Sequence, residues 1–236
     1  MRQRRRFILC RIYGGSEYDY AKCIQETSDG GLILVGYTDS DDGDISFNHG
    51  GYDVWILKLS ANGNKVWEKT YGGSGNEEGW SIVQTADGGY AIAGSTRSND
   101  GDVTGFHGDC DFWVFKINAT GVLQWQKAIG GASADVGKSV VQTTNNDYVV
   151  LGYSKSEDGD ITKFYGNYDF FLTKLNQTGT VKWTKNFGGS ASESGNDVYL
   201  TSSGNYLLAG ASSSDDHDVD FNQGSKDFWL VKAIPK

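Results

Sequence analysis

The chain has 236 residues, of which 33 are glycine, only 1 is proline and 13% are aromatic. Disordered chains are poor in aromatic residues, so this composition favours many short strands joined by tight turns. The net charge of −9 argues against nucleic acid as a partner, because phosphate binding needs clustered Lys and Arg.

The N-terminal residues predict neither a membrane span nor an export signal. The chain opens with the basic run MRQRRR, but its apolar part extends only from Phe7 to Cys10 before Arg11 interrupts it. Both kinds of segment need longer apolar stretches. The cysteines Cys10, Cys23 and Cys110 show no spacing typical of a disulfide framework or a zinc site.

One unit of sequence occurs four times. Tyr13-Gly14-Gly15 aligns with Tyr71-Gly72-Gly73, Ile129-Gly130-Gly131 and Phe187-Gly188-Gly189, and the same shift of 58 residues aligns the whole chain without an insertion. An unbroken repeat leaves no room for a linker between domains. We therefore predict a single domain, 1–236, with repeats 13–70, 71–128, 129–186 and 187–236.

Each unit predicts four antiparallel strands. In the second copy, WSIVQTADGGYAIAGSTRS contains two apolar runs around a turn at Ala86–Gly89. After an acidic loop, DFWVFKINATGVLQWQKAIGG gives two more runs around Asn118–Gly121. Glycines in such turns accept a positive φ, and no stretch has helical periodicity.

Tandem four-stranded units stack radially as the blades of a β-propeller. The third strand of the first unit, VWILKL, is nearly all apolar, as expected where both faces of a sheet are buried. The fold class predicted is all-β, a β-propeller of four blades with four antiparallel strands each.

Ring closure is predicted from the two ends of the chain. The fourth copy contains three strands, whereas residues 7–12 align with the fourth strand of the first copy, 65–70. We expect residues 7–12 to complete the last blade and close a four-bladed monomer. The alternatives are an open half-ring that pairs with a second chain, and a piece of a longer propeller.

Tryptophans and lysines recur once in most copies. Trp67, Trp125 and Trp183 are expected to pack one blade on the next. One lysine also recurs on the third strand of each copy. These lysines are expected near the rim, at the end of the molecule opposite the acidic loops that precede the third strands: Lys58, Lys116, Lys174 and Lys232.

Residues 71–131 read YGGSGNEEGWSIVQTADGGYAIAGSTRSNDGDVTGFHGDCDFWVFKINATGVLQWQKAIGG. This segment resembles the tandem units of bacterial secreted or cell-surface propeller proteins, many of which end in a type IX secretion sorting domain. The resemblance covers residue 13 to the end. It implies a propeller and a secreted or cell-surface location. A weaker similarity links Gly63–Trp67, Gly121–Trp125 and Gly179–Trp183 to the tryptophan-docking turns of quinoprotein propellers, and it implies a shared structural turn without the quinone.

Acidic loops precede the third strand of each unit, and most of the 30 carboxylates lie in these loops and the links between units. Because consecutive strands alternate in direction, loops and links should share one end of the molecule. Closely spaced aspartates are ligands that Ca²⁺ prefers, but they also cap turns by accepting backbone hydrogen bonds. The candidate calcium ligands are Asp42, Asp44, Asp100, Asp102, Asp158, Asp160, Asp216 and Asp218. In the fourth loop His217 replaces the glycine found at 43, 101 and 159.

Catalysis is the weakest interpretation of these loops. The three histidines, His49, His107 and His217, show no unique nucleophile partner, and carboxylates are too numerous to single out a pair. We predict no catalytic residue. The function expected is a non-catalytic extracellular or cell-surface binding or scaffold propeller, with an unknown protein or glycan ligand on the acidic end. The alternative is a propeller glycoside hydrolase or lyase that uses loop carboxylates, with the fourth copy departing most through His217 and Asp220.

Overall fold

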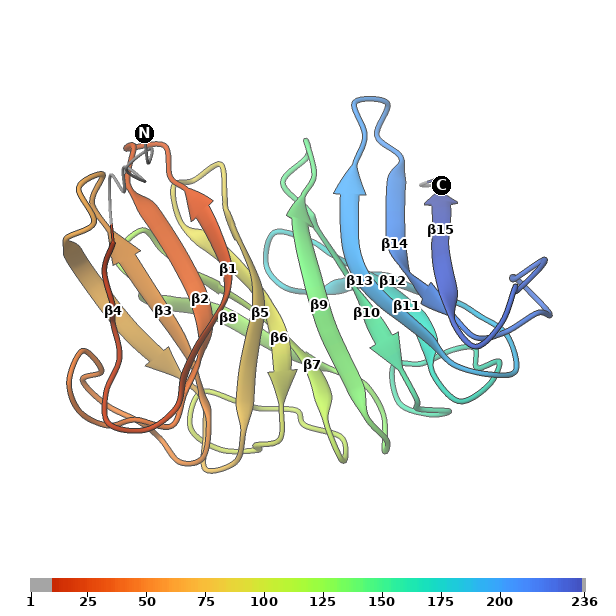
Figure 1. Ribbon diagram of the computed structural model, residues 1–236, viewed down its shortest axis with the longest axis horizontal. Helices are drawn as coiled ribbons and strands as arrows, with labels where there is room; N and C mark the ends of the chain where they lie inside the picture. The colour runs from red at the N-terminus through yellow and green to blue at the C-terminus, as the bar shows by residue number, and fades with distance from the viewer. Residues whose placement is uncertain (1–9, 235–236) are drawn as a thin grey trace, which may run out of the picture.

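The computed structural model describes residues 10–234, and this part of the chain consists of β-strands and loops without a helix (Figure 1). The strands are β1 (Asp19–Glu26), β2 (Leu32–Thr38), β3 (Asp53–Leu59), β4 (Lys65–Tyr71), β5 (Glu77–Gln84), β6 (Tyr90–Thr96), β7 (Asp111–Ile117), β8 (Leu123–Ile129), β9 (Asp135–Gln142), β10 (Tyr148–Ser154), β11 (Asp169–Leu175), β12 (Val181–Phe187), β13 (Glu193–Leu200), β14 (Tyr206–Ser212) and β15 (Asp227–Ala233).

Each 58-residue repeat forms one antiparallel sheet. Three sheets have four strands, β1–β4, β5–β8 and β9–β12, and the last has three, β13–β15. Neighbouring strands in the sheet are also neighbours in sequence, which is the simplest antiparallel order. The predicted all-β fold and the repeated antiparallel unit are confirmed.

Left-handed residues close the turn between the first two strands of each sheet. Gly30, Gly88 and Gly204 have φ between 76° and 81°, a conformation that glycine adopts without a steric penalty. The third sheet uses Asn146 instead, with φ 62°, and asparagine is one of the few other residues that tolerate this region.

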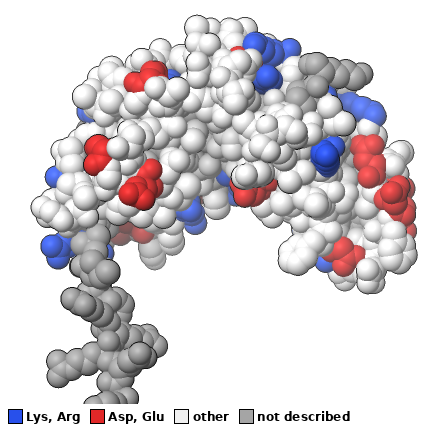
Figure 2. All heavy atoms as spheres, turned by 90° about the horizontal axis from the view of Figure 1, so that it is seen from above, with Lys and Arg blue, Asp and Glu red and all other residues white. Residues whose placement is uncertain are grey.

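The four sheets are arranged along an arc. The first strands β1, β5, β9 and β13 contact one another in turn, so they form the inner row. Seen from above, the molecule is hollowed on the side where these strands lie (Figures 1 and 2).

The predicted closed ring is not found in the described part of the chain. The sheets β1–β4 and β13–β15 lie at opposite ends of the arc (Figure 1), and β15 has no partner on its outer side. Residues 10–12 form no strand, and the rest of the predicted closing strand, 7–9, lies outside the described residues. The side chains packed between the sheets set the angle from one sheet to the next, and the four sheets cover only part of a circle (Figure 2).

Hydrophobic layers fill the spaces between sheets. Phe112 packs edge-on against Phe171 of the next sheet, with ring centroids 5.0 Å apart. The predicted packing role of the repeated tryptophans is confirmed, because each contacts a tyrosine on the following sheet. These pairs are Trp67 with Tyr90, Trp125 with Tyr148 and Trp183 with Tyr206.

One apolar face at the end of the arc is exposed. Phe228 and Leu230 on β15 are 102% and 69% exposed, whereas the equivalent Phe112 and Val114 on β7 are 0% exposed. The residues on this face of β15 are therefore of the kind that contacts a further sheet elsewhere in the molecule.

Candidate functional site

The acidic loops and the links that contain Gly14-Gly15, Gly72-Gly73, Gly130-Gly131 and Gly188-Gly189 meet at one end of every sheet. The first aspartate of each candidate pair accepts a backbone N–H hydrogen bond from the link, at 2.7–2.8 Å. The second accepts the N–H of the first link glycine at 3.3 Å. The acceptors are Asp42, Asp100, Asp158 and Asp216 in the first series and Asp44, Asp102, Asp160 and Asp218 in the second.

The close fit of these loops explains the double glycine. A Cβ on Gly73 would lie 2.3 Å from the Asp100 Oδ1, and the backbone N–H of Asp102 donates to the carbonyl oxygen of Gly72 at 2.8 Å. The hydrogen bond from the Ser74 N–H lowers the pKa of Asp100, as the Ser190 N–H does for Asp216. The loop aspartates therefore hold the links in place through backbone hydrogen bonds. We call each such aspartate a clasp.

The calcium prediction stays a prediction. Within residues 10–234, no three His, Cys, Asp or Glu side chains are grouped so that they could hold a metal ion. Each predicted pair is brought together around its own link, and oxygens of both aspartates already accept backbone hydrogen bonds. A hard cation needs six to eight oxygen ligands, so calcium would have to draw further oxygens from backbone carbonyls and water.

A second set of carboxylates lies buried between neighbouring sheets, which the sequence analysis did not identify. Each pair combines the residue that begins a third strand with the residue that begins the next first strand, and all six side chains are at most 1% exposed. The sequence feature that could have identified them is that an acidic residue recurs at both positions in each repeat. The pairs are Asp53 with Glu77, Asp111 with Asp135, and Asp169 with Glu193.

These pairs approach each other closely. The Asp53 Oδ1 and the Glu77 Oε2 lie 2.3 and 2.6 Å from the point where a Cβ of Gly72 would stand. In the part of the chain that the structure describes, the Asp53 Oδ1 has no hydrogen-bond partner. Burial, reinforced by the neighbouring carboxylate, raises the pKa of the third-strand aspartates Asp53, Asp111 and Asp169 to about 6. Because the pairs are inaccessible, they cannot act on a substrate in solvent.

Two histidines are held by the same buried aspartates. The Nδ1 of His49 lies 2.7 Å from the Asp53 Oδ2, and His107 and Asp111 repeat this contact at 2.7 Å. The Nε2 of His49 faces the Asp102 carboxylate at 3.8 Å. A nucleophilic triad needs a hydroxyl or thiol at that nitrogen, so this arrangement supports a structural role.

Three of the four repeated lysines, Lys58, Lys116 and Lys174, pair with aspartates and so are not free rim cations, whereas Lys232 is exposed. Lys58 and Lys116 are buried, and their ammonium groups pair with Asp29 and Asp87 in the turns between first and second strands at 3.1 and 3.0 Å. The expected place at the opposite end from the acidic loops is therefore right for these two lysines, but their charges are neutralised.

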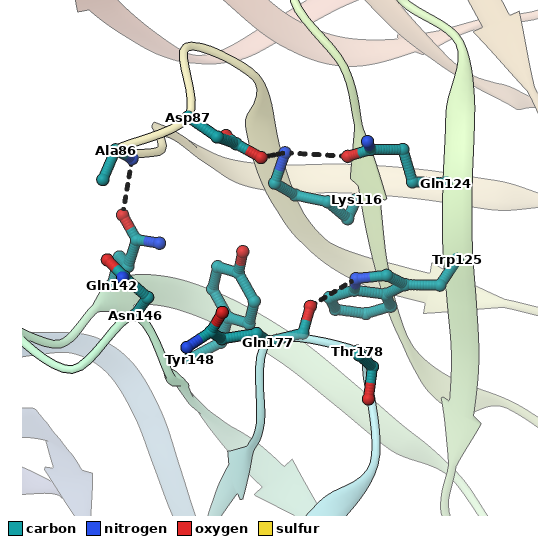
Figure 3. Close-up of a pocket in the computed structure, with 10 residues that line it drawn as sticks. All are labelled: Ala86, Asp87, Lys116, Gln124, Trp125, Gln142, Asn146, Tyr148, Gln177 and Thr178. Carbon is teal, nitrogen blue, oxygen red and sulfur yellow. Dashed lines mark hydrogen bonds and ion pairs between the residues drawn. The ribbon is translucent and has the colours of Figure 1, made fainter.

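A groove of about 550 Å³ lies between the second and third sheets at this end (Figure 3). Its polar groups already bond one another. The Trp125 Nε1 donates to the carbonyl oxygen of Gln177 at 3.0 Å, and the Ala86 N–H donates to the Gln142 Oε1 at 2.9 Å. Between the first two sheets the Ser28 N–H donates to Gln84 in the same way. The hydrogen bonds along this groove therefore join the second and third sheets, and an equivalent bond joins the first two.

No known family model matches the chain. Among curated proteins, regulatory protein FlaEY of Caulobacter vibrioides is 26% identical over 172 residues, which covers 65% of this chain and 18% of that protein. The chain thus spans less than a fifth of the curated relative that it matches.

Two solved structures align with the chain at low sequence identity. A protein of unknown function from Dyadobacter fermentans aligns with a TM-score of 0.53 and 12% identity, over 84% of this chain and 64% of that one. A protein of unknown function from Bacteroides caccae aligns with a TM-score of 0.47 and 9% identity, over 80% and 52%. The first likeness supports the repeated antiparallel architecture alone.

Proposed function

We propose that this protein is a non-catalytic binding or scaffold module in which the four sheets act as consecutive blades of a β-propeller, secreted or displayed at the cell surface. The observation that carries the proposal is that all four acidic loops use their aspartates for the same backbone hydrogen bonds. An active site requires one loop to depart from the others. The location rests on the resemblance to secreted and surface propeller proteins.

The acidic end is the proposed docking surface for a protein or glycan partner with positive charge. Asp41, Glu157 and Asp215 occupy the same place in three repeats, are exposed, and stand beside the clasping aspartates. Charges of this kind steer a cationic partner and raise the association rate at low salt. They can be reversed without removing a clasp.

An array of glycans and extracellular proteins probed with the labelled chain tests this proposal. We expect a ligand whose binding weakens with salt and is lost in the triple variant Asp41→Lys, Glu157→Lys, Asp215→Lys. The control is Glu26→Lys, an exposed charge at the other end of β1. Binding that survives the triple variant would place the site elsewhere. Mass spectrometry of each bound ligand completes the test, because cleavage would favour the hydrolase or lyase alternative.

A further inference from the structure

The first strand of every sheet carries a one-residue β-bulge at the same place in the repeat. The strand pairing skips one residue in β1, β5, β9 and β13. These strands line the hollowed side of the arc (Figures 1 and 2). A bulge turns a side chain away from the regular alternation and is common beside functional sites. The bulged residues are Lys22, Trp80, Lys138 and Asn196.

The residue type at the bulge is not repeated, unlike the residues around it. Three bulges follow a glycine, Gly79, Gly137 or Gly195, that packs against backbone or side chains of the preceding sheet. A requirement of the fold acts alike on all copies, as it does on the clasping aspartates. The bulged residue changes from lysine to tryptophan to lysine to asparagine along the four copies. This variation therefore points to a role in binding and not in the fold.

Three of the four side chains meet in one cluster. The Lys138 ammonium lies 3.0 Å from the centroid of the Trp80 ring, and the Lys22 ammonium lies 4.8 Å from it. Lys22 is also 4.9 Å from the Tyr37 ring, and Lys138 is 5.8 Å from the Tyr153 ring. Two cations and several aromatic faces thus share the hollowed side.

The polar groups of this cluster lack partners. The Trp80 Nε1 is buried and has no hydrogen-bond acceptor among the described residues, which is costly for an N–H donor. Within residues 10–234, neither Lys22 nor Lys138 has a carboxylate within ion-pair distance. Burial, with a smaller contribution from the like charge of Lys22, lowers the pKa of Lys138 to about 8, against the opposing charge of Glu78.

We propose that Lys22, Trp80 and Lys138 form a binding site for a carboxylated saccharide. A uronic acid carboxylate pairs with the two ammonium groups and, once the Trp80 side chain turns to expose its buried N–H, accepts that hydrogen bond, while the sugar ring lies on the tyrosine faces. Charge-assisted hydrogen bonds of this kind are about twice as strong as neutral ones. Aromatic rings supply the apolar surface that a sugar ring needs.

This site is independent of the acidic end. It binds an anion on the inner strands, whereas the proposed function places a cationic partner on the loops. The two proposals therefore fail separately: the triple loop variant leaves saccharide binding intact, and variants of the cluster leave a cationic partner bound.

Isothermal titration calorimetry with trigalacturonate, and with a neutral galactose trisaccharide as the control ligand, tests the site. We expect binding of the carboxylated saccharide alone. Lys22→Ala and Lys138→Met should each weaken it at least tenfold, and Trp80→Phe, which keeps a ring but removes the N–H, at least threefold. The variant expected to increase the affinity is Asn196→Lys. It adds a third cation at the fourth bulge and should tighten binding severalfold.

Lys232→Ala, an exposed lysine on β15, should leave the affinity unchanged. Because Lys22 and Asn196 are exposed, their variants keep the test valid if Lys138→Met fails to melt cooperatively. The proposal is overturned if trigalacturonate does not bind, if the neutral trisaccharide binds equally well, or if Lys22→Ala and Lys232→Ala have equal effects. Binding of a sulfated but not of a carboxylated trisaccharide would also overturn it.

Discussion

The buried hydroxyl of Tyr71, the last residue of β4, donates a hydrogen bond of 2.6 Å to the carbonyl oxygen of Gly121 in the β7–β8 turn of the next sheet. Burial raises the pKa of this tyrosine. Tyr13 makes the equivalent hydrogen bond to the carbonyl oxygen of Gly63, in the β3–β4 turn. Tyr13 therefore lies against the first sheet as the end of a preceding fourth strand would.

Tyr71→Phe should lower the free energy of unfolding by about 1 kcal/mol, because it leaves the ring in place and removes one buried hydrogen bond. Chemical denaturation measures the loss. The third and fourth copies carry Ile129 and Phe187 at this position, so an apolar side chain without a hydroxyl is compatible with the fold there. A Tyr71→Phe protein as stable as the parent would contradict the assignment.

The repeat made much of the fold predictable. The shift of 58 residues, the turn glycines and the nearly all-apolar third strands can be read from the sequence, and they predicted the strands and the place of the acidic loops. The bulges at Lys22, Trp80, Lys138 and Asn196 were missed because a bulge adds one residue to a strand without any turn signal. Comparing the four copies position by position would have shown the mismatch of residue types there.

Features that depend on the distance between sheets could not be predicted. The burial of Lys58 beside Asp29 and the pairing of Asp53 with Glu77 join residues from different strands or sheets, and a single sequence carries no measure of how closely those elements approach. The curvature of the arc has the same origin. It depends on the summed volume of the side chains between sheets, which pattern alone does not give.

His217→Gly should stabilise the protein by about 1 kcal/mol. His217 has φ 56°, whereas the glycines at 43, 101 and 159 adopt the same region with φ between 61° and 65°. A side chain in this region is strained, and glycine removes that strain at some cost in chain entropy. The reverse change, Gly101→His, should destabilise, since a Cβ there lies 2.3 Å from the carbonyl oxygen of Gly72. Thermal melting of both variants decides the prediction, and a lower melting temperature for His217→Gly would refute it.

Asp158→Ala separates the clasp from a calcium site. The Asp158 Oδ1 accepts the Ala132 N–H at 2.8 Å, so its loss should cost about 1–2 kcal/mol with or without calcium. Glu157→Ala, the exposed neighbour, should change stability by less than about 0.5 kcal/mol. Calcium bound by these loops would raise the melting temperature by mass action. A rise at millimolar calcium that disappears in Asp158→Ala would favour the metal, and equal melting curves in calcium and chelator would favour the clasp alone.

Acid should stabilise the folded chain by protonating the buried carboxylate pairs. The pKa of Asp111 is raised to about 6 in the folded chain, above its unfolded value of about 4. Its contribution to stability is therefore full below pH 4 and is lost as the pH rises through 6. The groups facing it are His107 and Asp135, and His107 in turn faces Asp160.

Asp111→Asn should then raise stability at pH 7.5 by on the order of 2 kcal/mol and lose this advantage at pH 4. The amide keeps an acceptor for the His107 N–H and offers a donor to Asp135. Asp227→Asn is the matched control, because Asp227 holds the same repeat position on the last sheet, where no further sheet follows in the described chain. Equal pH profiles for the parent and Asp111→Asn would show that the pair carries no such cost.

The exposed face of β15 should be covered in solution. Phe228 and Leu230 stand where Phe112 and Val114 are fully buried. An open strand edge with apolar neighbours associates readily. Closure within one chain would give a monomer near 25.7 kDa, whereas cover by a second chain would give a dimer.

Leu230→Asp tests this closure, because a charge buried between sheets should cost about 3 kcal/mol or more, whereas a change on an open surface costs less than about 0.5 kcal/mol. Deleting residues 1–12 should destabilise to a similar degree and cause aggregation. Light scattering after size exclusion separates the arrangements, since a dimer that Leu230→Asp dissociates would mean that a second chain covers the face. A monomer whose stability neither change affects would mean that the arc stays open.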